Sequence, residues 1–236
     1  SSALLDMAGF QTVNGDLYEA FWSEKPVVKI AVYDDITASK PFKGWGSPER
    51  VRHWNHPEGK DVDLVTYTNC EQVELYLNGR KLGVQKLSDF PNWIMNWRKI
   101  AYEPGTLRAV GLRDGKAVCE EILVTAGELS QIQVKADAKS IAPGGIVHVE
   151  VQLMDTDGHP VRHRETELEF DAVGADILGL DNGVLTAEQS FLEKRVRPTH
   201  EGRCLCVLRA GTQAGKMELT VGGKNLPPSR ITIDIK

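Results

Sequence analysis

Acidic side chains are the most abundant groups in this chain that can do chemistry, with 33 Asp and Glu among 236 residues. Hydrolysis of a glycosidic bond needs two carboxylates on one bond, about 5–5.5 Å apart when the configuration is retained. Glu167, Glu169 and Asp171 alternate with apolar residues, so we expect them on the solvated face of a strand. Most other acidic residues fall on similar faces or in turns. The sequence therefore nominates no catalytic pair.

Two short segments carry metal-ligating residue types, but neither has the full pattern of a site. His53 and His56 would share a face only in a helix, and Pro57 favours an extended or turn conformation instead. Asp155-Thr156-Asp157-Gly158 resembles the start of a calcium loop, yet the later ligands are missing, so we expect a β-turn there. The sequence has no glycine-rich phosphate loop and no G-x-S-x-G elbow. We predict no metal and no cofactor.

Tryptophans are the remaining candidates, because sugars can stack their C–H faces on exposed indole rings. Trp45 and Trp54 lie in a long polar stretch, residues 34–60, and long loops are often functional or docked on a neighbour. We take these two as candidate carbohydrate contacts. The competing explanation is packing, since tryptophan is highly buried on average. For Trp93 and Trp97 the surrounding strand pattern favours packing.

The cysteines have no spacing typical of a metal or redox motif. Cys70, Cys119, Cys204 and Cys206 form no C-x-x-C pair. Cys204 and Cys206 would point to the same face of one strand, which is poor geometry for a bond between them. We interpret all four as small buried hydrophobic residues.

Bulk properties exclude two further classes. A net charge of −5 argues against a nucleic-acid-binding protein, which needs a basic face, and no apolar run approaches the ~20 residues of a membrane-spanning helix. The length allows two domains of ordinary size. The chain opens Ser1-Ser2-Ala3-Leu4, with neither an initiator Met nor a signal peptide, and we interpret it as part of a longer polypeptide.

The elements that must position any site are predicted to be short strands. Asn78-Gly79 indicates a type I′ hairpin, in a register that pairs Leu77 with Arg80, Leu75 with Leu82 and Val73 with Val84. Asp114-Gly115 indicates a second hairpin, in a register that pairs Leu112 with Ala117 and Val110 with Cys119.

Further alternating segments extend this pattern along the chain, and one segment suggests a helix. Other strands are expected at residues 27–33, 62–68, 93–100, 132–136, 147–153, 168–172, 203–209, 217–221 and 230–236. Tyr18, Phe21 and Trp22, at spacings of three and four, suggest a short amphipathic helix that Pro26 stops. We predict an all-β fold of two tandem immunoglobulin-like antiparallel β-sandwiches, over residues 27–126 and 127–236.

Several segments, in order along the chain, resemble glycoside hydrolase family 2 enzymes of the β-galactosidase-like type found in Bacteroides-type bacteria. They are Leu5–Phe10, Phe21–Val28, Tyr67–Cys70 with Val73–Gly83, Tyr102–Gly111 and Gly179–Gly183. Residues 1–26 resemble the end of the family's catalytic (β/α)8 barrel and the following linker. The sequence departs from the family at Gln11-Thr12-Val13, where Pro-Lys-Asp is usual, and in the longer loop around Trp45.

The resemblance implies a non-catalytic region. The family's acid/base Glu follows an Asn, and this chain contains no Asn-Glu dipeptide. It therefore implies accessory domains that contact an upstream barrel of the same polypeptide, in a periplasmic or extracellular setting, with carbohydrate and a homo-oligomer as further possible partners. The alternatives are a carbohydrate-binding module that uses Trp45 and Trp54, and an immunoglobulin-like adhesion or structural tandem.

Overall fold

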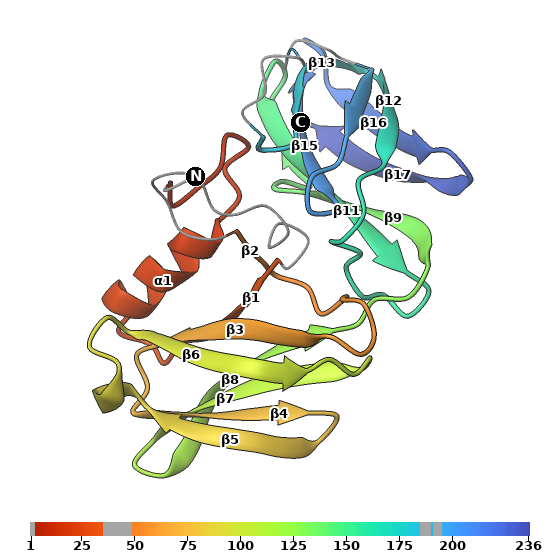
Figure 1. Ribbon diagram of the computed structural model, residues 1–236. Helices are drawn as coiled ribbons and strands as arrows, with labels where there is room; N and C mark the ends of the chain where they lie inside the picture. Colours follow the sequence, from red (N-terminus) through yellow and green to blue (C-terminus); the bar gives the residue numbers. More distant parts are fainter. Residues whose placement is uncertain (1–2, 35–48, 185–189, 191–194) are drawn as a thin grey trace. The chain divides into compact units, whose positions relative to one another are not determined.

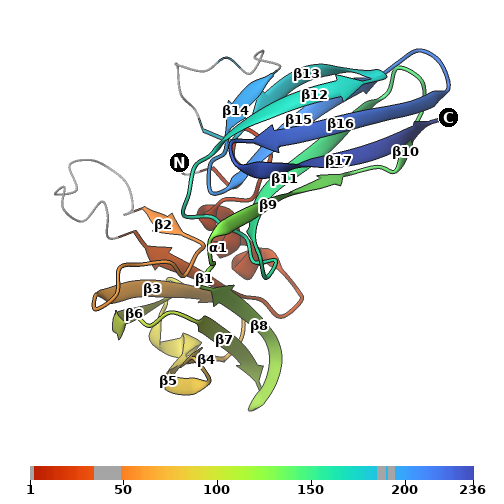
Figure 2. The same cartoon turned by 90° about the vertical axis from the view of Figure 1, so that its right-hand side faces the viewer.

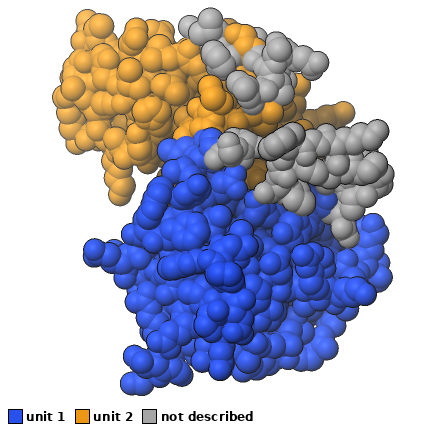
Figure 3. Space-filling view, turned by 60° about the vertical axis from the view of Figure 1, so that its left-hand side comes forward, with its two compact units in different colours: residues 1–5, 11–125 blue, residues 6–10, 126–236 orange. Residues whose placement is uncertain are grey.

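The computed structural model describes residues 3–34, 49–184, 190 and 195–236, and these divide into two compact units. The first unit comprises residues 1–5 and 11–125, and the second comprises residues 6–10 and 126–236 (Figure 3). Each unit is built almost entirely of antiparallel strands. Helix α1 (Val13–Trp22) belongs to the first unit.

The first unit is a sandwich of two four-stranded sheets (Figure 1). One sheet has the order β2 (Arg50–Val51), β1 (Val28–Tyr33), β3 (Asp61–Thr68) and β6 (Ile94–Ala101). The other has the order β5 (Arg80–Lys86), β4 (Gln72–Leu77), β7 (Thr106–Arg113) and β8 (Lys116–Val124). A short 3-10 helix, η1 (Leu87–Asp89), follows β5.

The core of the first unit forms because both sheets alternate apolar and polar residues and turn their apolar faces inward. Ile30 and Leu64 come from one sheet and Leu75 and Leu107 from the other, and all four are at most 1% exposed. The alternation of β4 in the first hairpin buries Val73, Leu75 and Leu77, whereas Val84 on β5 is 50% exposed.

The register of the first hairpin is only partly as predicted. Asn78 and Gly79 have φ values of 51° and 78°, which confirms the type I′ turn, and Leu77 pairs with Arg80. A β-bulge between Leu75 and Tyr76 then shifts the pairing, so that Leu75 faces Gly83 and Val73 faces Gln85. The predicted pairs of Leu75 with Leu82 and Val73 with Val84 are wrong, because the bulge adds one residue to β5.

The second hairpin shows the same kind of departure. Leu112 pairs with Ala117 as predicted, but a bulge places Gly111, rather than Val110, opposite Cys119. Cys119 still packs against the core from a half-buried position. In both hairpins the turn residues predicted the turn correctly. A bulge residue beyond the turn then shifted the strand pairing by one position.

The second unit is also a two-sheet sandwich (Figure 2). One sheet has the order β13 (Ala175–Asp181), β15 (Arg203–Ala210), β11 (Ile146–Asp155) and β9 (Leu129–Ala136). The other has the order β10 (Ser140–Ile141), β17 (Leu226–Ile235), β16 (Gly215–Gly223), β12 (Glu167–Val173) and β14 (Val196–Pro198). Strand β10 pairs with β17 in parallel, and the other pairings of these two sheets are antiparallel.

Alternation predicted most of the core of the second unit, with one exception on β11. Val147, Val149, Val151 and Leu153 are fully buried, as expected. The same alternation places Gln152 on the solvent face of β11, yet Gln152 is only 8% exposed. The backbone of Gly202 covers it, and the Gln152 side chain donates a hydrogen bond to the Gly202 carbonyl oxygen (2.9 Å). A turn from elsewhere in the chain thus buries a position that local pattern assigns to solvent.

Candidate functional site

Helix α1 is held at its start by a cap and a close backbone crossing. The Thr12 hydroxyl accepts a hydrogen bond from Gly15 N (3.1 Å) and so caps the helix. A Cβ atom at Gly15 would come within 2.4 Å of the Leu4 carbonyl oxygen, so the preceding segment can cross here only over glycine. The helix ends at Ser23, which is extended. This confirms the predicted helix.

The inner face of α1 covers the outer face of the β2-β1-β3-β6 sheet. Ala20 is fully buried there, and Val13 and Leu17 pack on the same apolar cluster. The sheet contributes Ala31 and Val65, whose side chains point away from the sandwich core. Strands β1 and β3 are therefore covered on both faces, which explains why Ile30–Val32 and Leu64–Thr68 are buried without alternation.

Polar contacts fix the helix to β2 and to the chain that enters it. Asp16 is 4% exposed, and its carboxylate accepts from Arg52 Nε (2.7 Å) and Gln11 Nε2 (2.8 Å). Arg52 also donates to the Gln11 carbonyl oxygen (2.8 Å). Burial raises the pKa of Asp16, and the guanidinium of Arg52 offsets this only in part. The group is a structural clamp that joins α1 to the segment after β2.

The outer face of α1 carries aromatic rings that are partly or largely exposed in the described structure. Tyr18 and Phe21 are 37% and 36% exposed, and Trp22 is 70% exposed. Their rings contact one another, with centroids 4.9 Å apart for Tyr18 and Trp22 and 5.9 Å for Tyr18 and Phe21. Phe21 also contacts Trp93, at 5.2 Å. We call Tyr18, Phe21, Trp22 and Trp93 the aromatic face. An exposed apolar surface of this kind is typical of an interaction site.

A shallow groove adjoins the aromatic face at Trp93. Its volume is about 530 Å³, and it is lined by Phe90, Pro91 and Trp93 together with polar side chains, among them Lys86 and Glu71. Trp93 has a positive φ of 62°, which is uncommon for a residue with a side chain and directs it out of the regular strand path. The groove extends the apolar surface of α1 onto the start of β6.

The tryptophans named from sequence lie in different environments. Trp45 falls outside the described residues. Trp54 is fully buried: its indole N–H donates to the Glu103 carbonyl oxygen (3.0 Å), and its ring contacts Tyr102 at 5.1 Å. An indole buried in this way has no free face for a sugar ring. Trp97 is 5% exposed in the sandwich core, where packing was expected.

The calcium-like segment folds as the predicted β-turn. Asp155, Asp157 and His159 bring possible ligand atoms within 4.8 Å of one another. However, the Asp155 carboxylate already accepts backbone N–H bonds from Gly127, Asp157 and His159 (2.8–3.0 Å). Burial of Asp155 opposes its ionisation, but these donors outweigh it and hold the pKa below its usual range. The carboxylate is thus committed to shaping the turn.

One further carboxyl group has the perturbed pKa that is common at active sites. Burial raises the pKa of Glu121 to about 7. Its carboxylate accepts a hydrogen bond from Ile30 N on the edge of β1, beyond the two residues that β2 pairs. Asp16 lies near enough to raise this pKa further, but it is bound to Arg52. Glu121 therefore protects a strand edge, and the two carboxyls do not form a free pair.

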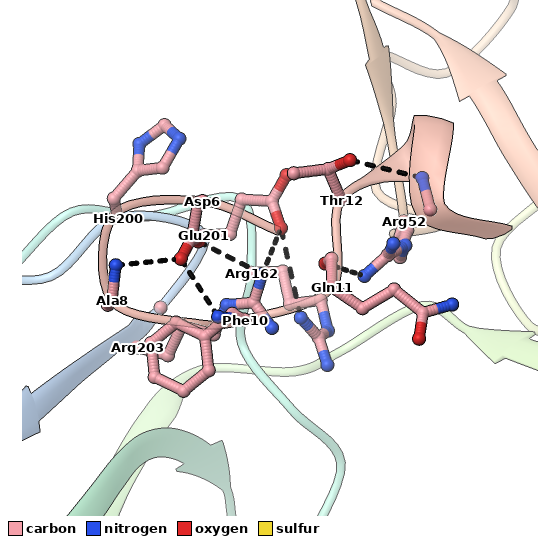
Figure 4. A network of polar contacts seen from close by, with 12 residues as sticks. Asp6, Ala8, Phe10, Gln11, Thr12, Arg52, Arg162, His200, Glu201 and Arg203 are labelled. Carbon is pink, nitrogen blue, oxygen red and sulfur yellow. Dashed lines mark hydrogen bonds and ion pairs between the residues drawn. The ribbon is translucent and has the colours of Figure 1, made fainter. Parts of the chain in front are cut away.

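The segment Asp6–Phe10 forms a compact turn within the second unit (Figure 4). The Asp6 carboxylate accepts from Ala8 N (3.0 Å) and Phe10 N (2.9 Å). The Arg203 guanidinium lies 4.3 Å from the centre of the Phe10 ring and 3.8 Å from an Asp6 carboxylate oxygen. This combined cation–π and ionic contact explains why Asp and Phe stand at these two positions.

Sequence reasoning identified the aromatic spacing of α1 but did not assign it to a site. The signal was present, because Val13, Leu17 and Ala20 form a second apolar stripe beside the one that contains Phe21 and Trp22. A helix on the surface of a domain needs only one such stripe for its own core. Two stripes predict a helix that is covered on both sides.

Comparison with known proteins gives two family matches that together cover most of the chain. Residues 122–232 match the model of glycoside hydrolase family 2 C-terminal domain 5, and residues 59–119 match a domain of unknown function, DUF4982. A β-galactosidase of Bacteroides ovatus, BoGH2A, is 28% identical over 94% of this chain and 24% of its own length.

Solved structures agree over nearly the whole chain. A glycosyl hydrolase family 2 member from Bacteroides cellulosilyticus superimposes with a TM-score of 0.90 at 32% identity, over 98% of this chain and 31% of its own. A β-glycosidase from Bacteroides vulgatus does so with a TM-score of 0.83 at 26% identity, over 99% of this chain and 28% of its own. The chain thus spans between a quarter and a third of the length of these relatives.

Fold and surface together define a tandem of immunoglobulin-like β-sandwiches that carries an exposed aromatic helix. The comparisons add the family: the chain belongs to glycoside hydrolase family 2, and the part of that family it corresponds to is the C-terminal region. Among the described residues no helix is long and apolar enough to cross a membrane.

Proposed function

We propose that this chain is a non-catalytic accessory region of a β-galactosidase-like family 2 enzyme, and that its aromatic face docks on the catalytic barrel of the same polypeptide. The observation that carries the proposal is the aromatic face of α1, on which Trp22 is 70% exposed. An enzyme barrel is the occupant that the relatives favour, because this chain corresponds to only 24–31% of their lengths. Through this contact the sandwiches would support the barrel, its substrate entrance or its oligomerisation.

The proposal includes a division of the chain. Residues 1–26, with α1, are assigned to the end of the barrel and its linker, and residues 27–126 and 127–236 to the two accessory sandwiches. The clamp between Asp16 and Arg52 fastens α1 to the first sandwich through a buried ion pair (2.7 Å), which suits a linker segment between the barrel and that sandwich. Removing one partner of such a pair is strongly destabilising.

A hydrolysis assay tests the non-catalytic part of the proposal. The purified chain is expected to give no turnover of an aryl β-galactoside or an aryl β-glucuronide above a buffer control. Glu121→Gln is the matched variant, because burial raises the pKa of the Glu121 carboxyl to about 7. Turnover by the chain that this variant abolishes would contradict the proposal.

A carbohydrate-binding module remains the second candidate, favoured by the exposure of Trp22 beside the groove at Trp93. Of the two candidate residues from sequence, Trp54 is buried, so this function would have to use Trp22, Trp93 or the undescribed Trp45. A change in tryptophan fluorescence on addition of millimolar sugar would favour this candidate over docking on a barrel.

A further inference from the structure

Two cysteines far apart in sequence meet inside the first unit. Cys70 lies in the turn between β3 and β4, and Cys119 lies on β8, with 3.5 Å between their sulfur atoms. The other two cysteines, Cys204 and Cys206, lie two positions apart on the same face of β15 in the second unit, where both are buried. Sequence analysis treated all four as small buried hydrophobic residues, and spacing alone does not distinguish the pair.

The backbone around this pair is fixed from both sides. The N–H of Cys70 donates to the Thr68 hydroxyl (3.0 Å), and the next residue, Glu71, donates its N–H to the Leu112 carbonyl oxygen (3.0 Å). On the other side, Cys119 pairs with Gly111 in the β7–β8 ladder. The two thiols therefore face each other across a hydrogen-bonded turn on one side and a strand pairing on the other.

Gly111 makes the space that both sulfur atoms occupy. A Cβ atom there would lie 2.7 Å from the Cys119 sulfur and 2.8 Å from the Cys70 sulfur, closer than real Cβ atoms come to such atoms. Any other residue at Gly111 would push the sulfurs out of this space. Its φ is not among the positive values, so the space, and not the backbone conformation, requires glycine here.

We propose that Cys70 and Cys119 form a disulfide bond when the protein meets a small-molecule disulfide or a thiol–disulfide oxidoreductase. Cys119 is half-buried and Cys70 is fully buried, so the incoming disulfide is attacked first by the Cys119 thiolate, which releases one thiol of the reagent. The Cys70 thiolate then attacks the Cys119 sulfur of the mixed disulfide and releases the second thiol. Overall, two protein thiols are oxidised and one reagent disulfide is reduced to two thiols.

The bond would close a long loop and would form slowly in the folded chain. The two cysteines are 49 positions apart, and constraining a loop of this length stabilises a fold by restricting its unfolded state. Burial, together with the neighbouring Cys70, raises the pKa of the Cys119 thiol to about 12, so little thiolate exists at neutral pH. The rate of closure is therefore expected to rise about tenfold for each unit of pH over the neutral range.

Thiol counting and peptide mapping test the bond. After incubation of the folded chain with oxidised glutathione, denatured protein is expected to show two titratable thiols, against four in the reduced protein. A proteolytic digest is expected to contain a linked peptide with Cys70 and Cys119. The oxidised chain should unfold at least about 4 °C above the reduced chain. Four remaining thiols, or a linked peptide that contains Cys204 or Cys206, would overturn the proposal.

Two variants make the assignment specific. Cys119→Ser should abolish both the linked peptide and the dependence of the unfolding temperature on oxidation. Cys204→Ser, in the second unit, should retain both. The measurements on the unaltered chain do not depend on either variant folding, and retention of a redox-dependent unfolding temperature in folded Cys119→Ser would contradict the proposal.

Discussion

Glu121 shows how a single buried carboxyl can resemble a catalytic group and yet serve the fold. Burial raises its pKa to about 7, and its carboxylate accepts the Ile30 N–H at a strand edge. Because the folded pKa lies above the ordinary value of 4.5, the folded state binds the extra proton between these two values. The contribution of Glu121 to stability is therefore fully present below about pH 4.5 and is lost as pH rises through about 7.

Glu121→Gln tests this reading directly. The unaltered chain is expected to lose on the order of 2 kcal/mol of unfolding free energy between about pH 4.5 and pH 7, whereas Glu121→Gln should lose much less. Urea unfolding at several pH values measures the difference. Asp16, whose pKa is also raised, is present in both proteins, so the difference between them reports Glu121 together with its interaction with Asp16.

The neighbouring Glu120 provides the matched control. Its carboxylate makes an exposed ion pair with Arg108 (2.7 Å) on the outer face of the sheet. Glu120→Gln is therefore expected to keep the pH dependence of the unaltered chain. If Glu121→Gln shows the same loss of stability with rising pH as the control, the assigned role of Glu121 is wrong.

Residue-level environments were the hardest to predict from sequence. Trp54 lies in a polar stretch, and its burial depends on Tyr102 and the Glu103 carbonyl oxygen, which are almost fifty residues away. Gln152 follows a clean alternating pattern and is nonetheless covered by the Gly202 turn. Both cases depend on contacts between residues that are far apart in the sequence, and a local sequence pattern does not predict such contacts.

At the scale of elements, the first hairpin is tied to the rest of its sheet by one side chain. The Asn78 side chain donates to the Pro104 carbonyl oxygen (3.0 Å) and accepts from Thr106 N (2.8 Å). Gly105 lies between these partners with a φ of 132°, and a Cβ atom there would come within 2.0 Å of the Asn78 side-chain oxygen. The Asn-Gly turn thus positions a second turn as well as closing its own hairpin.

Asn78→Gly separates these two roles, because glycine keeps the positive φ and removes the side-chain bonds. We expect the variant to lose about 1–3 kcal/mol of unfolding free energy, measured by urea unfolding. Asn225→Gly is the control: Asn225 also has a positive φ, 62°, and its side chain makes no hydrogen bond within the described part of the chain. Equal effects of the two substitutions would show that the bridge to Pro104 and Thr106 is unimportant.

The elements themselves were largely predictable. Alternation and turn residues located the strands around both Asn-Gly and Asp-Gly hairpins, and the helix up to Trp22. Register was predictable only up to the bulges at Leu75 and Gly111, since a bulge depends on how the neighbouring strand pairs. Strands β2, β10, β13 and β14 were not predicted; among the described residues the short β14 pairs with β12, at a sheet edge.

For the molecule as a whole, the family could be recognised from the sequence, whereas the aromatic face could be identified only from the structure. The aromatic spacing of α1 was visible in the sequence, but which stripe lies on the sheet depends on the fit of Ala20 against Ala31 and Val65. The exposure of Trp22 could be known only after that packing was known. The exposure of the aromatic face is therefore a consequence of the fold, whereas the absence of an Asn-Glu dipeptide is visible in the sequence alone.

The central claim is that the aromatic face binds a family 2 catalytic barrel, and a binding measurement tests it most directly. The chain, expressed separately, is titrated with the catalytic barrel encoded in the same reading frame, and complex formation is followed by sedimentation velocity. The double variant Phe21→Ser, Trp22→Ser removes two exposed rings, and Val173→Ser, at a 65% exposed apolar position in the second unit, is the matched control.

We expect a one-to-one complex between the chain and the barrel. The control variant should bind the barrel as tightly as the unaltered chain, and the double variant should bind it with at least about tenfold weaker affinity. Circular dichroism should show the same thermal unfolding for the double variant and the unaltered chain within a few degrees, because both rings are already exposed. A reading frame without a barrel, or a double variant that binds the barrel as tightly as the unaltered chain, would contradict it.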